Sequence, residues 1–135
     1  MLIAAFLTFA KIASGQDKDA IATIDFVKIE NGKFAEALFF YEHNWKVYRD
    51  VALERGYIKG YSVLSVNNDA TSNYNLMLIT EYEDSSQYNQ NEKRFQQIIQ
   101  TIRPDGPKLL NDLSPDEFRK KVLFQKTEIW FKSQE

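Results

Sequence analysis

Three strand-like segments of this sequence have apolar residues at both odd and even positions: residues 22–30, 57–66 and 75–82. In the third segment, Leu76 and Leu78 share one parity, and Met77 and Ile79 share the other. Successive side chains of a β-strand point to opposite faces of the sheet, so this pattern predicts a sheet that is covered on both faces. A half-covered antiparallel sheet would instead alternate apolar with polar residues.

The period of the apolar residues changes to that of an α-helix over residues 33–55, and Gly56 follows as the expected stop. The apolar residues of this helix recur at spacings of three and four and form one stripe: Phe34, Ala37, Leu38, Tyr41, Trp45, Tyr48 and Ala52. The only histidine, His43, lies almost opposite the stripe at ~100° per residue. We therefore expect His43 on a solvated polar face, without a chemical role.

Turn-forming residues at 67–74 separate the second and third strand segments and predict a hairpin with a long tip. Beyond the hairpin, Asp84 and Gln87 have the spacing of a capping box, which predicts the start of a second helix. That helix is expected to end before the helix-breaking residues 103–107.

A short helix and a final strand are predicted near the C-terminus. Ser114, Pro115 and Glu117 combine a capping box with proline at the first helical position. The last strand is expected over residues 123–132, which include several apolar residues.

The predicted order of elements is strand, helix, strand, strand, helix, short helix, strand. This is the ferredoxin-like β-α-β-β-α-β arrangement of the α+β class, an antiparallel sheet with its main helices on one face. The opposite face would be uncovered although the strands are apolar on both sides, and monomers rarely expose such a patch. We expect a second copy of the chain to cover it, giving a homodimer with the form of a dimeric α/β barrel.

The same elements resemble the dimeric α/β-barrel superfamily, in particular its secreted members without assigned function. The resemblance covers residues 21–131 and is carried by the segments "VKIENGKFAEA", "NWKVYRDVALERGYIKGY", "YNLMLITEYED" and "KTEIWF". It implies a fold shared by cofactor-independent monooxygenases, haem-degrading enzymes, haem-dependent peroxidases, chlorite-decomposing enzymes and stress-responsive binding proteins. Such a fold does not choose among these activities.

The haem-degrading branch of that superfamily uses an asparagine, a tryptophan and a histidine that converge from separate elements. Here His43, Asn44 and Trp45 are consecutive on one helix. Their side chains should diverge by ~100° steps, so these roles are not carried over.

The N-terminal residues have the pattern of an export signal. Residues 2–10 are an uninterrupted apolar run, shorter than the ~20 residues that span a bilayer. Ala13 and Gly15 then occupy the −3 and −1 positions of a cleavage site before Gln16, although no Lys or Arg precedes the run. This predicts a signal peptide over residues 1–15 and a single secreted or periplasmic domain over 16–135; a first buried helix or strand is the alternative.

The composition disfavours several classes of partner and cofactor. A net charge of −2 and a pI near 5.5 disfavour binding to nucleic acid. The chain has no cysteine and one histidine, which excludes disulfides and thiolate metal sites. We expect no bound metal, no cofactor and no membrane span in the mature chain.

A ligand pocket is expected between the sheet and the helices, with the long helix as its lid. Rings with polar tips suit a small apolar or aromatic ligand, although the same rings could simply form the core. The candidate pocket residues are Tyr41, Trp45, Tyr48, Tyr61, Glu81 and Tyr82.

Acid–base catalysis would require a carboxylate in that pocket, and the strand residues Asp25, Glu81 and Glu128 are the candidates. Two functions therefore stay open. One is an exported homodimeric domain for small-molecule binding or interaction. The other is a cofactor-independent monooxygenase-like enzyme acting on a small aromatic or apolar substrate. Whether the protein is an enzyme, and which residues would be catalytic, is not decided by the sequence.

Overall fold

The computed structural model describes residues 19–66 and 72–133. The predicted signal peptide and the tip of the predicted hairpin lie outside these residues. The described elements are β1 (Ile21–Ile29), α1 (Phe34–Phe40), η1 (Tyr41–Trp45), α2 (Lys46–Glu54), β2 (Gly60–Ser65), β3 (Leu76–Tyr82), α3 (Ser85–Asn89), α4 (Asn91–Ile102), α5 (Pro115–Phe118) and β4 (Arg119–Glu128).

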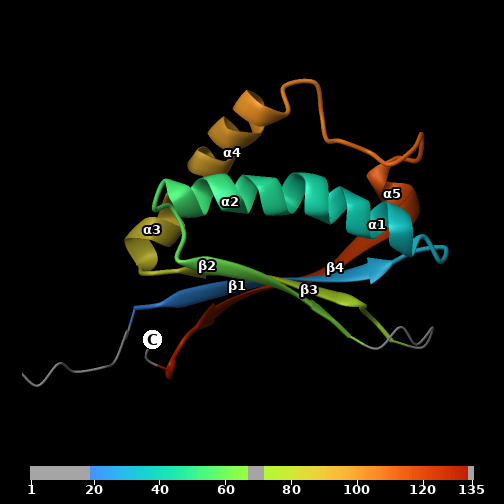
Figure 1. Ribbon diagram of the computed structural model, residues 1–135. Coiled ribbons are helices and arrows are strands. Elements are labelled where there is room, and N and C mark those ends of the chain that lie inside the picture. Colours follow the sequence, from blue (N-terminus) through green and yellow to red (C-terminus); the bar gives the residue numbers. More distant parts are fainter. Residues whose placement is uncertain (1–18, 67–71, 134–135) are drawn as a thin grey trace, which may run out of the picture.

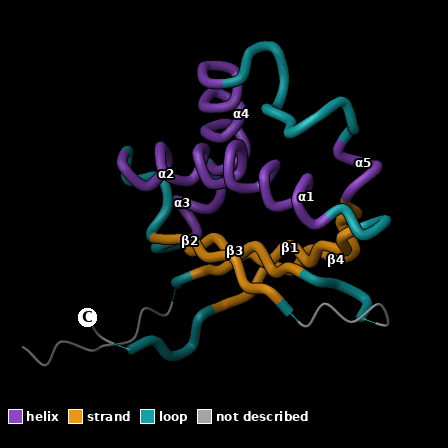
Figure 2. The backbone as a smooth tube through the Cα atoms, turned by 45° about the vertical axis from the view of Figure 1, so that its right-hand side comes forward, coloured by secondary structure: helices purple, strands orange, loops and turns teal. Residues whose placement is uncertain are grey.

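The four strands form one sheet in the order β2-β3-β1-β4, and every neighbouring pair is antiparallel. All the helices lie on one side of the sheet, and the long helix formed by α1, η1 and α2 crosses above it (Figures 1 and 2). The predicted α+β class and ferredoxin-like arrangement, including the short helix before the last strand, are confirmed.

The long helix begins and ends within a residue of its prediction, but it is not uniformly α-helical. Residues 41–45 form a π-helical turn, η1, between the α-helical segments. At the end of α2, Gly56 adopts a φ of 70° and its N–H donates to the Leu53 carbonyl at 3.1 Å. The left-handed glycine ends the helix as predicted. A π turn is wider than an α-helical turn, so it changes which side chains face the sheet, and such turns are frequent at functional sites.

The core lies between the long helix and the helix-facing side of the sheet. One cluster packs Val27, Leu78 and Phe118 against Tyr41 and Trp45 of the helix. A second cluster lies toward the other end of the helix and consists of Ile21, Tyr48, Ala52, Ile58, Tyr82 and Ile98.

Six of the seven predicted stripe residues are buried or partly buried, and Leu38 is the exception at 50% exposed. Ala37 is fully buried and directs that part of the helix toward the sheet. Leu38 lies ~100° further around the helix and faces outward. The prediction that Leu38 belongs to the inward-facing stripe was therefore wrong.

The last strand, predicted over residues 123–132, runs over Arg119–Glu128 instead. It starts directly after α5, where the Glu30 N–H donates to the Phe118 carbonyl at 2.9 Å and Arg119 pairs with Ile29. The charged residues 119–121 lack the apolar pattern of a strand, which is why the prediction began too late. Trp130 lies beyond the strand and is 75% exposed.

The predicted second helix is divided into α3 and α4 at Gln90. Asp84 caps α3 by accepting a hydrogen bond from the Gln87 N–H at 2.7 Å. The Gln87 side chain reaches back to the N–H of Glu83 rather than to that of Asp84, so the capping box is shifted by one residue. The capping box of Ser114 and Glu117, with Pro115 in the first turn of α5, is present as predicted.

The helix-free face of the sheet carries a row of apolar side chains that crosses all four strands. Leu64 on β2 pairs with Met77 on β3, Met77 pairs with Phe26 on β1, and Phe26 pairs with Leu123 on β4. These residues alternate with the buried helix-facing ones, so they point to the opposite side. Leu64 and Leu123 are about half exposed, and Met77 and Phe26 are partly buried. In Figure 2 no helix covers this side of the sheet.

Within the described residues, no helix is both long and apolar enough to span a membrane.

Candidate functional site

A cavity of about 350 Å³ lies between the long helix and the sheet. The sheet forms its floor, the wide turn η1 and its flanking helical residues form its roof, and α4 with the connection after it closes one side. Its lining residues are Asp25, Phe40, Tyr41, Asn44, Trp45, Tyr48, Arg49, Leu78, Ile99, Gly106, Pro107, Arg119 and Lys121.

Asp25 places a carboxylate on the helix-facing side of the central strand β1. It pairs with the buried Leu78 across the sheet and shares its parity with the buried Val27. A core position in the middle of a strand normally carries an apolar residue. Asp25 is only partly buried there because it faces the cavity.

Tyr41 and Trp45 each bring a buried polar atom to the cavity. Both residues are under 10% exposed, and neither the Tyr41 hydroxyl nor the Trp45 Nε1 makes a hydrogen bond to any described residue. Burial raises the pKa of the Tyr41 hydroxyl well above its usual value, with nearby Arg119 lowering it and Asp25 raising it. Native proteins leave few buried polar groups unpaired, so two such groups on one cavity need an explanation.

Arg49 packs against two aromatic rings. Its guanidinium carbon lies 4.2 Å from the centre of the Trp45 ring and 4.4 Å from that of Phe95, and its Nε donates to Thr80 Oγ1 at 3.2 Å. Burial lowers the pKa of Arg49 to about 10, and the nearby groups Tyr82 and Asp25 oppose this change. Arg49 therefore remains a cation at neutral pH, fixed in position at the cavity wall.

Arg119 brings a second guanidinium to the cavity from the start of β4. Its carbon lies 5.2 Å from the centre of the Phe40 ring, and its Nε is buried without a hydrogen-bond partner among the described residues. No carboxylate in the described part of the chain lies within ion-pair distance of Arg49 or Arg119. Because Lys121 also lines the cavity and Asp25 is its one acidic residue, the lining carries an excess of positive charge.

Asn44 closes the cavity by anchoring the chain that follows α4. Its Nδ2 donates to the Lys108 carbonyl at 2.8 Å, and its Oδ1 accepts from the Lys108 N–H at 2.7 Å. The same Nδ2 donates to the Phe40 carbonyl at 2.8 Å within the helix. Asn44 is 2% exposed, and these bonds hold Gly106 and Pro107 against the cavity.

The structure brings three of the six predicted pocket residues to the cavity, namely Tyr41, Trp45 and Tyr48. Tyr82 faces the helices but lies in the second core cluster, with its ring 5.4 Å from that of Tyr88. The prediction placed too many rings at one site, because the inward-facing rings divide between two clusters.

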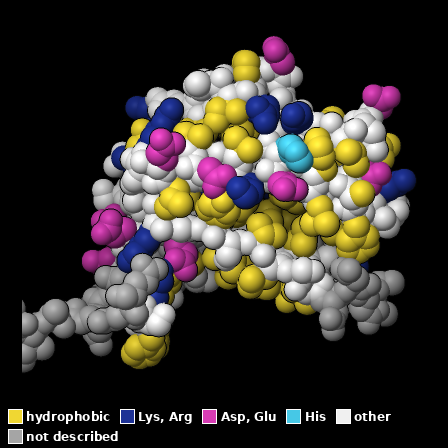
Figure 3. Space-filling model, viewed as in Figure 1, with side chains coloured by type: hydrophobic (Ala, Val, Ile, Leu, Met, Phe, Trp, Pro, Cys, Tyr) yellow, Lys and Arg dark blue, Asp and Glu magenta, His cyan; other side chains and the backbone are white. Residues whose placement is uncertain are grey.

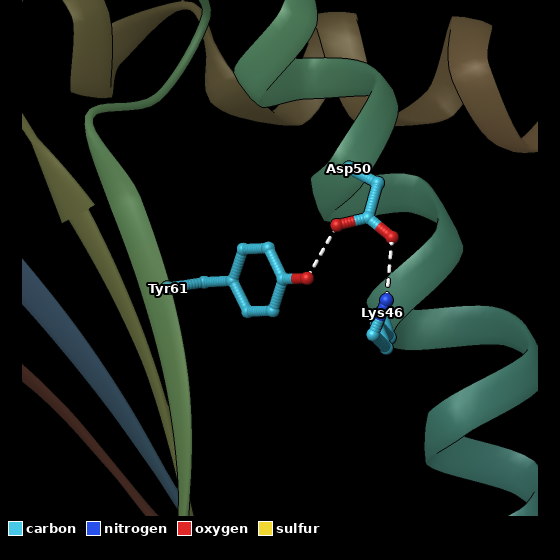
Figure 4. Close-up of polar contacts among 3 residues, drawn as sticks. All are labelled: Lys46, Asp50 and Tyr61. Atoms are coloured by element: carbon cyan, nitrogen blue, oxygen red, sulfur yellow. Dashed lines mark hydrogen bonds and ion pairs between the residues drawn. The ribbon is translucent and has the colours of Figure 1, made fainter.

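Tyr61 reaches from β2 to the long helix outside the cavity. Its hydroxyl donates to Asp50, whose other carboxylate oxygen accepts from Lys46 Nζ at 2.8 Å (Figure 4). The front face in Figure 3 shows Lys and Arg intermingled with Asp and Glu over this helix, above hydrophobic side chains at the junction with the sheet. This arrangement is a surface link between helix and sheet.

Neither Glu81 nor Glu128 lines the cavity. Glu81 shares its parity with Met77 on the helix-free face and forms an ion pair with Lys132 at 2.7 Å. Glu128 is exposed at the end of β4. Of the three carboxylates considered for acid–base chemistry, only Asp25 faces the cavity.

His43 lies outside the cavity lining but is not fully solvated, which corrects one expectation. Its ring stacks on Phe39 at 3.8 Å, its Nδ1 lies 2.9 Å from the Phe39 carbonyl, and it is partly buried. Arg103, from the chain after α4, donates to the His43 carbonyl at 2.9 Å. The long-range contact covers a face that the helical pattern alone leaves to solvent.

Sequence reasoning missed Arg49, Arg119 and the anchoring role of Asn44. The spacing of four between Trp45 and Arg49 was the one available signal, because residues four apart on a helix are neighbours and arginine stacks on tryptophan. The described residues contain no group of three or more His, Cys, Asp or Glu side chains placed to hold a metal ion.

Comparison with known proteins shows the fold and nothing more specific. No protein-family model matches the sequence, and no curated protein matches it significantly. The solved structures that share its fold include HapK from Hahella chejuensis, at 12% identity and a TM-score of 0.53 over 85% of this chain and 97% of that one. The fold that the predicted resemblance implies is thereby confirmed.

Two proteins from Bacteroides species are also similar. One, from Bacteroides thetaiotaomicron, is a conserved protein of unknown function described as a possible oxidoreductase, with 15% identity and a TM-score of 0.50 over 83% of this chain and 99% of that one. The other, from Bacteroides fragilis, is described as a dimeric protein with a ferredoxin-like fold, with 11% identity and a TM-score of 0.48 over 82% of this chain and 96% of that one.

Proposed function

We propose that this protein binds a small organic molecule in the cavity between the long helix and the sheet. The observation that carries the proposal is the pair of buried, unpaired polar atoms on Tyr41 and Trp45, which face a cavity of about 350 Å³. Ligand pockets typically measure ~300–1,000 Å³ and combine apolar walls with a few convergent polar groups. A ligand that accepts hydrogen bonds from these atoms would remove the cost of burying them unpaired.

Native mass spectrometry of protein purified from its own host, together with tryptophan fluorescence, tests this proposal. The chain has two tryptophans, so a Trp130→Phe variant reports on Trp45 alone. We expect a co-purifying small molecule, or a member of a panel of small aromatic compounds, to change the Trp45 emission. A bare protein mass together with unchanged emission across the panel would contradict the proposal.

A variant that fills the cavity provides a second readout. Ile99 lines the cavity, so Ile99→Phe should abolish binding while the protein stays folded. Leu110 is about half exposed and outside the lining, which makes Leu110→Phe the matched control. Loss of binding in both variants, or in neither, would place the ligand elsewhere.

A cofactor-independent monooxygenase-like enzyme is the second candidate, and the position of Asp25 in the cavity favours it. A carboxylate beside a bound substrate is suited to accept a proton at the start of such a reaction. On this alternative, wild-type protein with its ligand would consume O₂, and Asp25→Asn would still bind the ligand without consuming O₂. If the ligand-saturated wild type consumes no O₂, the monooxygenase alternative is wrong and ligand binding remains the proposed function.

We also propose a homodimer that pairs two helix-free sheet faces. The apolar row through Leu64, Met77, Phe26 and Leu123 supports it, because monomers rarely expose a contiguous patch of this kind. In light scattering we expect a dimer for the wild type, a monomer for Met77→Glu and a dimer for the control Leu53→Glu on the outer side of α2. A monomeric wild type at micromolar concentration would overturn the proposal.

Finally, we propose that the protein is exported and that the mature chain begins near Gln16. The support is the apolar run of residues 2–10 and the small residues Ala13 and Gly15. N-terminal sequencing of protein from the native host tests it. An intact Met1 in a cytosolic fraction would end the idea.

A further inference from the structure

We propose that the ligand of this cavity is a small aromatic carboxylic acid, whose carboxylate is held by Arg49 and Arg119. The inference rests on the proposed binding function and specifies its ligand class.

The charge of the lining is the first argument. Three cations, Arg49, Arg119 and Lys121, face the cavity together with one carboxylate, Asp25. Neither arginine has a carboxylate within ion-pair distance among the described residues. Burying a guanidinium without an anion is costly, and a bound carboxylate would offset that cost at both positions.

The geometry of Arg49 is the second argument. Its guanidinium packs against the rings of Trp45 and Phe95, and its Nε donates a hydrogen bond to Thr80. The two terminal nitrogens make no hydrogen bond to another described residue. A planar guanidinium held in one orientation is the group best suited to bind a carboxylate through two parallel hydrogen bonds.

Arg119 and Tyr41 supply further donors beside it. The Arg119 Nε is buried without a partner, and so is the Tyr41 hydroxyl, which lies close enough to Arg119 for the two to interact electrostatically. Both atoms are donors, and a carboxylate is an acceptor with several lone-pair sites. One acidic group would thus give both of these atoms a hydrogen-bond partner.

The rest of the lining suits an aromatic body. Phe40, Trp45, Leu78 and Pro107 present rings and aliphatic surface. The cavity volume is near the lower end of the range for ligand pockets, which favours a molecule of one or two rings. Asp25 would repel a second anionic group and would accept a hydrogen bond from a hydroxyl or amino substituent of the ligand.

The test compares three probes that share one ring system and differ in charge: 2-naphthoate, 2-naphthamide and 2-naphthylmethylamine. Dissociation constants are measured by Trp45 fluorescence in the full chain carrying Trp130→Phe. We expect the acid to bind at least about tenfold more tightly than the amide, and the amine to bind most weakly. Arg119→Gln and Arg49→Gln should each reduce the preference for the acid to about twofold or less.

Two further variants make the test specific. Arg119→Lys keeps the charge and should retain part of the preference for the acid. Lys120→Gln removes the same charge from the neighbouring residue, which does not line this cavity, and should leave the preference unchanged. Because Arg49 is partly buried against Trp45 and Phe95, Arg49→Gln can fail to fold, and Arg119→Gln then decides the result alone.

The outcomes separate this inference from the proposed function. Similar affinity for acid, amide and amine would overturn the inference, while the proposed small-molecule binding would still hold. A preference for the acid that survives Arg119→Gln would overturn it as well. If none of the three probes binds, the aromatic-acid assignment is wrong, and the native mass spectrum decides whether the cavity has any ligand.

Discussion

The side-chain amide of Asn44 hydrogen-bonds both backbone polar groups of Lys108, 64 residues further along the chain. It therefore serves as the partner that a neighbouring strand would otherwise provide. Because the Lys108 segment closes one side of the cavity, a single helical residue couples the roof of the site to its wall. This arrangement makes the stability of the site testable separately from the stability of the sheet.

Replacing Asn44 should loosen that wall. Asn44→Ala removes both hydrogen bonds to the Lys108 backbone, and a hydrogen bond of this kind contributes ~0.5–1.5 kcal/mol net. We expect a loss of about 1–3 kcal/mol in the free energy of unfolding, measured by denaturant titration, and faster hydrogen exchange at the Lys108 amide.

The exposed Asn111, whose side chain donates to Glu36 at 3.3 Å, provides the control for this prediction. Asn111→Ala should change the free energy of unfolding by less than ~0.5 kcal/mol. If the Lys108 amide exchanges equally fast in both variants, the Asn44 bonds do not hold the segment in place.

Trp45 and His43 should differ sharply although they are two residues apart. Trp45 is 8% exposed and packs against Arg49 and Tyr61, so Trp45→Ala should cost ~3–5 kcal/mol and abolish ligand binding. His43 stacks on Phe39 outside the cavity, so His43→Ala should cost no more than about 1 kcal/mol and leave binding unchanged. Melting temperatures and ligand titrations measure both. If His43→Ala abolished binding without lowering the melting temperature, His43 would belong to the site.

The link between Tyr61 and Asp50 should contribute little to stability. Tyr61 is partly buried and Asp50 is exposed, so water screens their interaction. A double-mutant cycle of Tyr61→Phe and Asp50→Asn should give a coupling of ~0.2–1 kcal/mol. A much larger coupling would mean that this contact holds β2 against the helix.

The architecture could be predicted from the sequence because the signals that specify it are local. Capping residues such as Ser114, the stop at Gly56 and the change of period at residue 33 each depend on neighbours along the chain. Local signals failed at residues 119–121, where charged residues concealed the start of β4.

The candidate site could be predicted only in part, because its determinants are long-range. Tyr41, Trp45 and Tyr48 were visible as an inward stripe on one helix. Asn44 is not an apolar residue of that stripe, but it lies in the π turn, is buried, and is paired with Lys108, 64 residues away. Arg119 comes from a strand more than seventy residues away, and no helical pattern indicates its position.

The ionisation of Tyr41 gives a prediction for alkaline pH. Burial raises the pKa of this hydroxyl above its usual value of ~10, so the folded protein keeps it protonated where the unfolded chain ionises it. Its contribution to stability is therefore complete below pH ~10 and is lost as the pH rises above that value, by up to ~1.4 kcal/mol per pH unit. Tyr41→Phe removes this contribution. The variant should lose less stability than the wild type between pH 10 and 11, as measured by denaturant titration at each pH.

Other groups also change the free energy of unfolding as the pH rises, and comparing variants separates their contributions from that of Tyr41. Burial lowers the pKa of Arg49 to about 10, so Arg49 releases its proton more readily in the folded state, and its contribution to stability increases with pH. Burial also raises the pKa of Tyr82, which acts in the same direction as Tyr41. Both remain in the wild type and in Tyr41→Phe, so the difference between the two slopes reports Tyr41. Tyr74→Phe, outside the cavity, controls for the loss of a hydroxyl elsewhere. If Tyr41→Phe and the wild type lose stability in parallel above pH 10, the Tyr41 hydroxyl is solvated, and the case for a buried donor in the cavity fails.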